Sequence, residues 1–455
     1  MDKTYRPYDP DQLFLMPPNL RDWLPREHLA YFVSDVVDDL DLSAIFQVYE
    51  REARGYPPYH PALMVKVLLY GYATGVRSSR RLARACVEDV AFRVLAANNT
   101  PDFRTLSEFR RRHLAALGAL FQQVLGLCRR AGLVKLGTVA LDSTKIKANA
   151  SKHKAMSYAR MERAEHELEA TVRRILEEAE QVDREEDARF GPDRRGDELP
   201  AELADPVRRL EKIREAKAAL EREAQEQARR QADAARAKLK ERDRRVGSSK
   251  GCPPRVPDPT QARPAPTAQR NFTDPDSKIM KGPEGVLQAY NAQAVVDARS
   301  QVIVAHDVSN QPSDVEHLVP MVEQVIARTR RRPRRLLADA GYCSEANLAY
   351  LDRRGIESYV ATERVEHGAA RPRDPRGRPP GGLTWRERMD RRLRTLRGQA
   401  VYRLRMLTAE PVFGQIKHAR GFRQFLLRGG GKVRGEWALM CTAFNLGKLW
   451  SAAYG

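Results

Sequence analysis

The sequence predicts an α/β protein with a mixed sheet flanked by helices, preceded by an all-helical region and interrupted by a long helical insertion. Apolar residues recur at helical spacing from about residue 20 to residue 130, a span without strand signals. Runs rich in β-branched residues begin at residue 138, and from residue 293 onward they alternate with amphipathic segments. This alternation is typical of a sheet covered by helices.

Three helices are expected early in the N-terminal region, over residues 27–40, 60–72 and 78–87. Thr105 and Glu108 have the spacing of a capping box, which predicts the start of a further helix. That helix carries three consecutive arginines, Arg110, Arg111 and Arg112. Short helices that end in a basic one are typical of helix-turn-helix DNA-binding domains, and the alternative is an ordinary bundle with a solvated basic face.

Residues 156–250 are expected to form two long helices, because they are rich in Ala, Glu, Arg and Gln and contain two apolar stripes at helical spacing. Phe190, Gly191 and Pro192 break the pattern between the stripes. The charges are mixed, which favours a spacer, a coiled coil or an oligomerisation arm over a nucleic-acid clamp. The Pro-, Ser- and Gly-rich segment that follows predicts a linker over residues 251–284.

The chain is strongly basic, with 80 Lys and Arg residues against 60 Asp and Glu residues and a formal charge of +20. A field of this sign attracts polyanions such as nucleic acid, although a merely basic soluble protein has it too. The five cysteines are far apart and form no CxxC pair, which argues against a disulfide scaffold and a zinc site. No signal peptide and no apolar stretch of about 18 residues are present, so we expect a cytoplasmic, nucleoid-associated protein that makes no membrane contact.

Three acids lie in settings that bring distant carboxylates together. Asp142 follows the apolar run 138–141, Asp339 follows the run 336–338, and Glu410 lies on a segment with helical periodicity. Carboxylates from neighbouring strands converge at one edge of a sheet, and hard cations such as Mg²⁺ or Mn²⁺ select oxygen ligands. Two such ions about 4 Å apart can clamp the attacking and leaving oxygens of a phosphoryl transfer, so these acids predict a two-metal site.

Each acid also has a structural interpretation. Asp142 suits a helix N-cap, Asp339 suits a turn, and Glu410 suits an exposed helical pair with Lys417. A hairpin is expected from the β-rich runs 293–296 and 301–308. Four further acids lie in predicted loops or beyond this hairpin, where we expect turn and cap roles: Asp274, Asp276, Asp307 and Asp314. The metal site is favoured because the three acids follow one another with the right local structures in so basic a chain.

The segment around Glu410 adds candidate phosphate ligands. Tyr402 and Arg405 are three residues apart and share a helix face, so Arg405 can grip a phosphate while Tyr402 positions DNA or packs in the core. Pro411 suits a first helical turn, which predicts that a new helix begins at Glu410.

A basic stretch interleaved with Phe422 and Phe425 follows, and it suits either a DNA strand or a solvated amphipathic helix. Two lysines also lie close behind Asp142 along the chain. The candidate DNA contacts are Lys145, Lys147, Arg110, Arg111, Arg112, Tyr402, Arg405, Lys417, Arg420 and Arg423.

Several motifs together resemble a known family. Leu141–Asn149 contains the first acid, Ala338–Tyr342 contains the second, and a Tyr-Arg-Glu-Lys series from Tyr402 to Lys417 contains the third. Residues 290–311 and 57–113 add a hairpin motif and a helical N-terminal motif. In these features the chain resembles the bacterial insertion-sequence transposases of the DDE type, whose catalytic core is ribonuclease-H-like.

Two departures from the family pattern are visible. Ser143 stands where many relatives have glycine, and four residues instead of three separate Arg405 from Glu410. On an ideal helix the extra residue rotates Arg405 by about 100° relative to Glu410.

The resemblance implies a DNA transposase that binds the terminal inverted repeats of its element, cleaves the ends and joins the 3′-hydroxyls to target DNA. It implies that Asp142, Asp339 and Glu410 are the catalytic residues and hold two Mg²⁺ ions, or Mn²⁺. Pairing of two ends implies a homodimer in the working complex. The alternatives are a metal-dependent nuclease of the same fold that does not join strands, and an inactive DNA-binding relative.

The chain is expected to divide into five parts. These are a helical DNA-binding domain (1–132), the first core strand with Asp142 (133–155), the helical insertion (156–250), the linker (251–284) and the remainder of the ribonuclease-H-like core (285–455).

Overall fold

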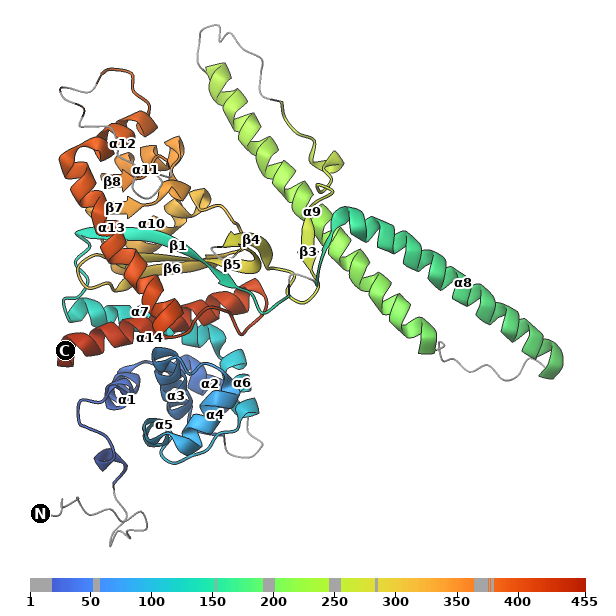
Figure 1. Cartoon of the computed structure of the whole chain (residues 1–455), viewed down its shortest axis with the longest axis horizontal. Coiled ribbons are helices and arrows are strands. Elements are labelled where there is room, and N and C mark those ends of the chain that lie inside the picture. The colour runs from blue at the N-terminus through green and yellow to red at the C-terminus, as the bar shows by residue number, and fades with distance from the viewer. Residues whose placement is uncertain are drawn as a thin grey trace, which may run out of the picture. The chain divides into compact units, whose positions relative to one another are not determined.

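The computed structural model describes residues 19–51, 58–151, 154–190, 201–244, 255–282, 285–363, 375, 377 and 380–455. The chain divides into two compact units, one made of Met1–Ile146 and Asn291–Gly455 and the other of Lys147–Tyr290. Figure 1 shows the helices and strands of both units.

The first unit begins with a helical region, as predicted. Its described elements are η1 (Leu20–Asp22), α1 (Leu29–Asp39), α2 (Ser43–Glu50), α3 (Pro61–Thr74), α4 (Ser79–Glu88), α5 (Val90–Leu95), α6 (Phe103–Arg112) and α7 (Leu114–Arg130). Helix α3 is buried on almost every side, which explains the nearly continuous apolar run in its sequence.

The start of α6 differs from the prediction. The Asp102 side chain accepts hydrogen bonds from two backbone N–H groups of the first turn, at 2.7 and 3.2 Å, so Asp102 is the N-cap. The predicted capping box of Thr105 and Glu108 is therefore wrong, and Glu108 forms an ion pair with Arg111 instead.

The sheet of the first unit contains β1 (Thr138–Lys147), the second half of β5 (Gly285–Asp297), β6 (Ile303–Ser309), β7 (Arg335–Ala338) and β8 (Glu357–Val360). The strand order is β6-β5-β1-β7-β8; β5 and β6 pair antiparallel, whereas β1, β7 and β8 pair parallel. The prediction that the first strand ends at Asp142 is wrong, because β1 continues to Lys147. Its pairing with β7 nevertheless stops at Leu141, so Asp142 lies beside the carboxyl end of β7.

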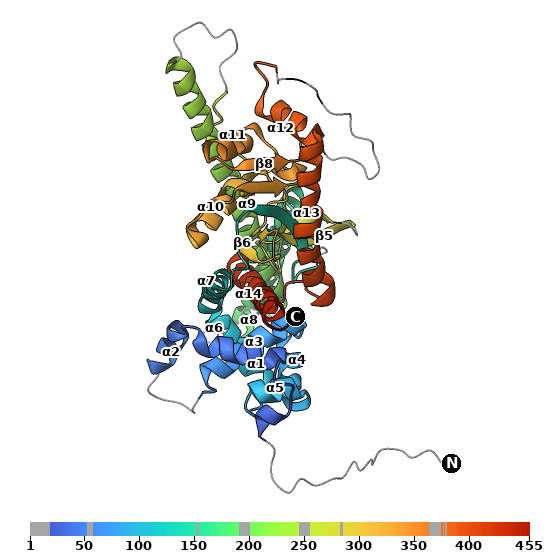
Figure 2. The same ribbon diagram turned by 90° about the vertical axis from the view of Figure 1, so that its left-hand side faces the viewer.

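Helices cover both faces of this sheet. The remaining elements of the unit are η4 (Val315–His317), α10 (Leu318–Thr329), η5 (Ala340–Tyr342), α11 (Glu345–Arg353), α12 (Trp385–Arg394), α13 (Leu396–Gly414), the π-helical turn η6 (Gln415–Ala419) and α14 (Gly430–Tyr454). Figure 2 shows α10 and α13 on opposite faces of the strands. Helix α14 packs against β6 as well as against α3 and α7, and through it the helical region and the sheet share one core.

Helix α13 runs through Glu410 and Pro411 to Gly414, so the prediction that a new helix begins at Glu410 is wrong. A proline inside a helix leaves the carbonyl four residues earlier without its usual donor. That carbonyl belongs to Leu407, and it accepts a hydrogen bond of 2.9 Å from Nε2 of Gln301, in the turn between β5 and β6. The sheet therefore supplies the bond that Pro411 cannot make.

The second unit contains a helical arm, α8 (Tyr158–Phe190) and α9 (Ala201–Arg244), as predicted for the insertion. Glu165 of α8 forms ion pairs with Arg214 and Lys217 of α9, while Tyr158, earlier on α8, hydrogen-bonds to Glu221, later on α9. Because the contacts run in opposite order along the two helices, α8 and α9 are antiparallel.

The span 251–284, predicted to be a linker, carries regular structure in its described residues. It contains η3 (Pro259–Gln261), β3 (Gln269–Asn271) and β4 (Lys278–Gly282). Strand β3 pairs with β2 (Ala155–Ser157), and β4 pairs with the first half of β5, both antiparallel. No helix among the residues placed by the structure has the length and apolarity needed to cross a bilayer.

Candidate active site

The three acids predicted from the sequence gather around one guanidinium group, that of Arg405. Nη1 of Arg405 donates to Oδ2 of Asp142 at 2.9 Å, and Nη2 donates to Oε1 of Glu410 at 3.2 Å. Asp339 interacts electrostatically with both Arg405 and Asp142. Residues far apart in the sequence are therefore brought to one place.

Two neighbouring strands position the aspartates. Strands β1 and β7 are parallel, and Leu141 pairs with Ala338, so the residues that follow them emerge at the same edge of the sheet. Asp339 then starts the η5 turn, where its Oδ1 accepts a hydrogen bond of 3.0 Å from the backbone N–H of Gly341. The turn role considered for Asp339 is thus present, and it fixes the carboxylate beside the other acids.

Helix α13 supplies both Arg405 and Glu410. The extra residue between them does not remove Arg405 from the site, because its long side chain reaches inward to Asp142 and remains bonded to Glu410. The Arg405 side chain is 17% exposed and that of Glu410 is 48% exposed, so the acid lies at the open side. The Arg405 guanidinium lies 6.0 Å from the centre of the Tyr402 ring, in agreement with the predicted shared face.

The site concentrates negative charge in a basic chain. Burial raises the pKa of Asp142 to about 6, and the charges of Asp339 and Glu410 act in the same direction. Arg405 and the backbone N–H of Ser143 lower this pKa, but they only partly offset the other effects. Three carboxylates that share one guanidinium gain stabilisation from any further cation that they can hold.

The donor chemistry fits a divalent metal, because carboxylate oxygens are the ligands that Mg²⁺ and Mn²⁺ select. As the side chains lie, no three Asp, Glu, His or Cys residues in the described part of the chain are grouped closely enough to hold an ion. Arg405 lies between Asp142 and Glu410 and binds an oxygen of each. Shared coordination of a metal by these acids therefore requires Arg405 to release at least one of them.

Comparison with protein families identifies two segments of the chain. Residues 18–112 match the family model described as Transposase domain (DUF772), and residues 264–446 match the model described as Transposase DDE domain. The chain belongs to the DDE transposase family. The resemblance inferred from the motifs and the ribonuclease-H-like fold class are thereby confirmed. Comparisons with curated proteins and with solved structures gave no match.

The two matches do not cover the whole site of this transposase. The DDE match contains Asp339 and Glu410, whereas Asp142 on β1 lies before it. Helices α8 and α9 lie between the two matched segments. The tertiary structure, through the β1–β7 pairing and Arg405, is what connects Asp142 to the matched part.

A fourth acid, Asp314, belongs to the surroundings of the site; it lies at the N-cap position of η4, but a cap role for its side chain is wrong. Its side chain makes no capping bond to η4. Instead Oδ1 accepts hydrogen bonds from Nδ2 of Asn291 at 2.6 Å and from Nε2 of Gln293 at 2.8 Å, and it pairs with Nζ of Lys145 at 3.5 Å. Asn291 and Gln293 alternate with small apolar residues in β5, and this alternation was the available sequence signal.

The arginines of α6 differ in their surroundings. Arg110 is only 4% exposed and donates to Oη of Tyr72, the carbonyl of Arg77 and Oγ of Ser79, so its predicted DNA contact is wrong. Arg111 and Arg112 are exposed and stay candidates.

The residues of the predicted basic and aromatic stretch after Glu410 also lie in different surroundings. Phe422 and Phe425 are fully buried against each other, so the prediction that they stack on DNA is wrong. Arg420 is half-buried, donates to the carbonyl of Ala73 at 3.1 Å and lies over the Phe444 ring, which engages it in packing.

The other candidate DNA contacts differ in their access to solvent. Arg423 is exposed beside His418, and Lys147 is exposed at the end of β1. Lys417 is half-buried in the π-helical turn η6, and Lys145 is half-buried in its pair with Asp314.

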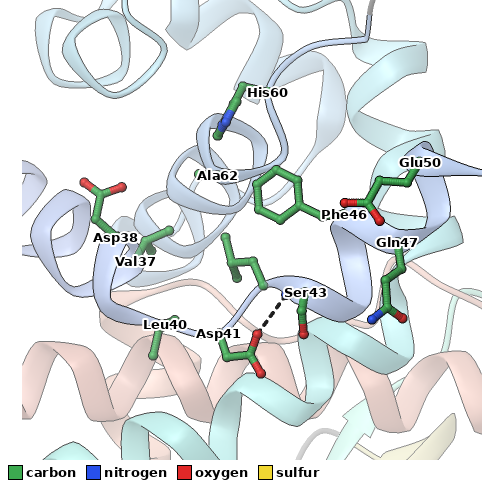
Figure 3. A pocket seen from close by; sticks show the side chains of 11 residues that line it. Val37, Asp38, Leu40, Asp41, Ser43, Phe46, Gln47, Glu50, His60 and Ala62 are labelled. Carbon is green, nitrogen blue, oxygen red and sulfur yellow. Dashed lines mark hydrogen bonds between the residues drawn. The ribbon is translucent and has the colours of Figure 1, made fainter.

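A cavity of 520 Å³ opens among α1, α2 and the start of α3 (Figure 3). Its lining includes the carboxylates of Asp38, Asp41 and Glu50, and Asp41 accepts a hydrogen bond from the backbone N–H of Ser43. A cavity with this charge repels phosphate groups. The cavity is therefore not a candidate site for a DNA phosphate.

Proposed function

We propose that this transposase cleaves the ends of its insertion sequence by metal-dependent phosphodiester hydrolysis and joins the 3′-hydroxyl ends to target DNA. The supporting observation is the gathering of Asp142, Asp339 and Glu410, from β1, the turn after β7 and α13, around one basic side chain. Rigidly held carboxylates of this kind are the donor set that two-metal phosphoryl transfer requires.

The three acids would hold two ions, Mg²⁺ or Mn²⁺, which supply Lewis-acid chemistry at the phosphoryl oxygens. Arg405 presents a planar fork of donors that suits a phosphate as well as it suits the carboxylates it now binds. When Arg405 binds a DNA phosphate, it releases the acids, and Tyr402 keeps its guanidinium aligned on the same helix face.

Terminal inverted repeats would bind to the helical region, with Arg111 and Arg112 among the contacts. Lys147, Arg423 and Lys417 would contact phosphates elsewhere on the chain. Joining two ends to one target requires that both ends are held together, so the working complex would contain at least two copies of the chain.

Asp142→Asn tests this function in an assay of Mg²⁺-dependent cleavage of DNA that carries an element end. We expect a loss of at least about 100-fold, since removal of a residue that merely supports a metal ligand typically costs 10–100-fold. The matched control is Asp307→Asn, a partly exposed acid of β6 that pairs with Arg434 at 3.4 Å, and it should cleave normally. Unchanged cleavage by Asp142→Asn would remove this site from consideration.

The second step needs its own assay, because a nuclease of the same fold would also pass the first. Pre-cut ends with free 3′-hydroxyls are incubated with target DNA and Mg²⁺. A transposase yields joined product, and a nuclease without strand transfer yields none.

A further inference from the structure

Asp314 lies at the start of η4, where two amide donors and a lysine converge on one carboxylate. The Asp314 side chain is 13% exposed and that of Lys145 is 18% exposed, so the pair is largely shielded from water. Burial raises the pKa of Asp314, but the hydrogen bonds from Asn291 and Gln293 and the charge of Lys145 outweigh it and bring this pKa below its ordinary value. Several polar groups therefore stabilise the charged form of Asp314 and fix the position of its side chain.

Asp314 is bonded to the strand that carries Asp142. Residues i and i+2 of a strand share a face, so Ser143 and Lys145 point to the side opposite Asp142. Lys145 pairs with Asp314, and the Ser143 hydroxyl hydrogen-bonds to it. Asp142 instead bonds to Arg405 on α13, and Figure 2 shows α13 and α10, the helix after η4, on opposite faces of the strands. Asp314 thus holds β1 from the face that Asp142 does not use.

Asp314 also borders the turn that carries Asp339. A Cβ placed on Gly341 would lie 3.1 Å from Oδ1 of Asp339 and 3.2 Å from Oδ2 of Asp314, so both carboxylates flank this glycine. Tyr342, the next residue, is fully buried, and its hydroxyl hydrogen-bonds to the Gln293 side chain that also binds Asp314. One hydrogen-bond network therefore contacts both β1, which contains Asp142, and the η5 turn, which begins at Asp339.

We infer that Asp314 is a positioning residue of the active site, which locks β1 and the η5 turn in one register and so sets the separation of Asp142 from Asp339. This inference rests on the proposed function. Metal ligands must be held within about 0.5 Å of their productive positions, and residues that support them typically change metal affinity or activity 10–100-fold. The effect should appear in metal affinity and kcat, because Asp314 acts through the two aspartates rather than on DNA.

Asp314→Asn is the direct test, because it keeps the side-chain size and removes the charge that holds Lys145. Binding of Mn²⁺ to the full chain without DNA, measured by electron paramagnetic resonance, should weaken about 10-fold. The kcat for Mg²⁺-dependent cleavage should fall about 10–100-fold, while KM for DNA changes less than about 3-fold. Asp307→Asn is the matched control and should change neither quantity.

Each outcome decides the inference. Unchanged Mn²⁺ affinity and kcat in folded Asp314→Asn overturn it, and so does a lower unfolding midpoint with unchanged Mn²⁺ affinity, which marks a purely structural role. Complete loss of Mn²⁺ binding, equal to that of Asp142→Asn, also overturns it, because Asp314 would then be a ligand. Wild-type chain that binds Mn²⁺ without cleaving DNA defeats the proposed function alone, and wild-type chain that binds no Mn²⁺ defeats both.

Asn291→Ala is the second variant, in case Asp314→Asn does not fold. It removes the 2.6 Å hydrogen bond from Nδ2 of Asn291 to Oδ1 of Asp314 and leaves Asp142, Asp339 and Glu410 unchanged in sequence. Weaker Mn²⁺ binding by this variant supports the inference, and unchanged binding overturns it.

Discussion

The first unit contains two clusters of arginine and acidic side chains, and the two clusters differ in their balance of charge. In the helical region, Arg77 and Arg110 surround the fully buried Glu436. At the candidate site, Arg405 is shared by Asp142 and Glu410, with Asp339 nearby. Positive charge is in excess in the first cluster and negative charge in the second, so only the second has a reason to take up a cation.

The cluster around Glu436 is closed by its own hydrogen bonds. Glu436 accepts bonds from the backbone N–H groups of Leu426 and Leu427, at 3.0 Å each. Arg77 donates to the carbonyls of Gly421 at 2.9 Å and Gln424 at 3.0 Å, so it fastens the helical region to the segment before α14. These hydrogen bonds are made within the protein, as expected for a cluster with a structural role.

The cluster around Arg405 is open by comparison. Glu410 is 48% exposed, and burial together with the neighbouring acids raises the pKa of Asp142 to about 6. An excess of negative charge such as this one destabilises the folded chain, and it is typically found at functional sites. The comparison therefore predicts that the cluster around Arg405 binds a cation and that the cluster around Glu436 does not.

The largest effect is expected for Arg77→Ala, which leaves the buried Glu436 carboxylate and two backbone carbonyls with fewer partners. Unfolding in urea at pH 7 should show a loss of about 3 kcal/mol or more, and added Mg²⁺ should not restore it. Arg84→Ala is the matched control, since Arg84 forms an exposed pair with Glu88. We expect the control to stay within about 0.5 kcal/mol of the wild type.

The loss in Arg77→Ala should also depend on pH. Burial already raises the pKa of Glu436 in the wild type, and removal of Arg77 raises it further. A raised folded-state pKa gives stability that is present at low pH and lost as pH rises, so the difference from the wild type should be larger at pH 7 than at pH 5. An equal loss at both values contradicts the assigned role of Glu436.

The next effect concerns Asp142, whose pKa rises from 3.8 to about 6 on folding. Its folded-state pKa is raised, so its contribution to stability is present below pH 3.8 and is lost as pH rises through about 6. In EDTA, the free energy of unfolding of Asp142→Asn should therefore rise by about 2 kcal/mol relative to that of the wild type as the pH increases from 4 to 7. Urea unfolding at both pH values measures this gain, and parallel pH curves for the two proteins contradict it.

A smaller change is expected for Arg405→Ala. Removal of the guanidinium leaves three carboxylates without their shared cation, and we expect a loss of about 1–2 kcal/mol in EDTA at pH 7. Here Mg²⁺ should restore stability, because a ligand that binds only the folded chain stabilises it. If millimolar Mg²⁺ fails to restore Arg405→Ala, the contrast with the cluster around Glu436 is lost.

The smallest change in stability is expected for Arg111→Ala, because Arg111 is exposed and pairs with Glu108 on the surface. Its unfolding midpoint should not change measurably. DNA affinity, measured by fluorescence anisotropy at several salt concentrations, should fall, and the salt slope should decrease by about one. An unchanged slope would remove Arg111 from the DNA contacts, whereas Arg110→Ala should affect folding because Arg110 is buried.

Local patterns predicted much of the fold. The apolar run 336–338, from which the position of Asp339 was inferred, lies in β7 (Arg335–Ala338), because a short apolar run before a turn signal is typical of a buried strand. The two long helices of the insertion were also evident from composition and periodicity. The error at Glu410 occurred where a partner remote in the sequence replaces a local rule, because Gln301 bonds to the carbonyl that Pro411 leaves without its helical donor.

The sequence by itself determined the element types, the excess of positive charge and the identity of the three acids, because these depend on nearest neighbours and residue chemistry. Only the tertiary structure decided that Arg110 is buried while Arg111 is exposed, and that the Asp314 side chain bonds to Asn291, Gln293 and Lys145 rather than capping η4. Burial and pairing depend on groups brought from other elements, such as Tyr72 for Arg110 and Asn291 for Asp314. Periodicity shows that a helix or strand has two faces, but the packing of the whole chain decides what covers each one.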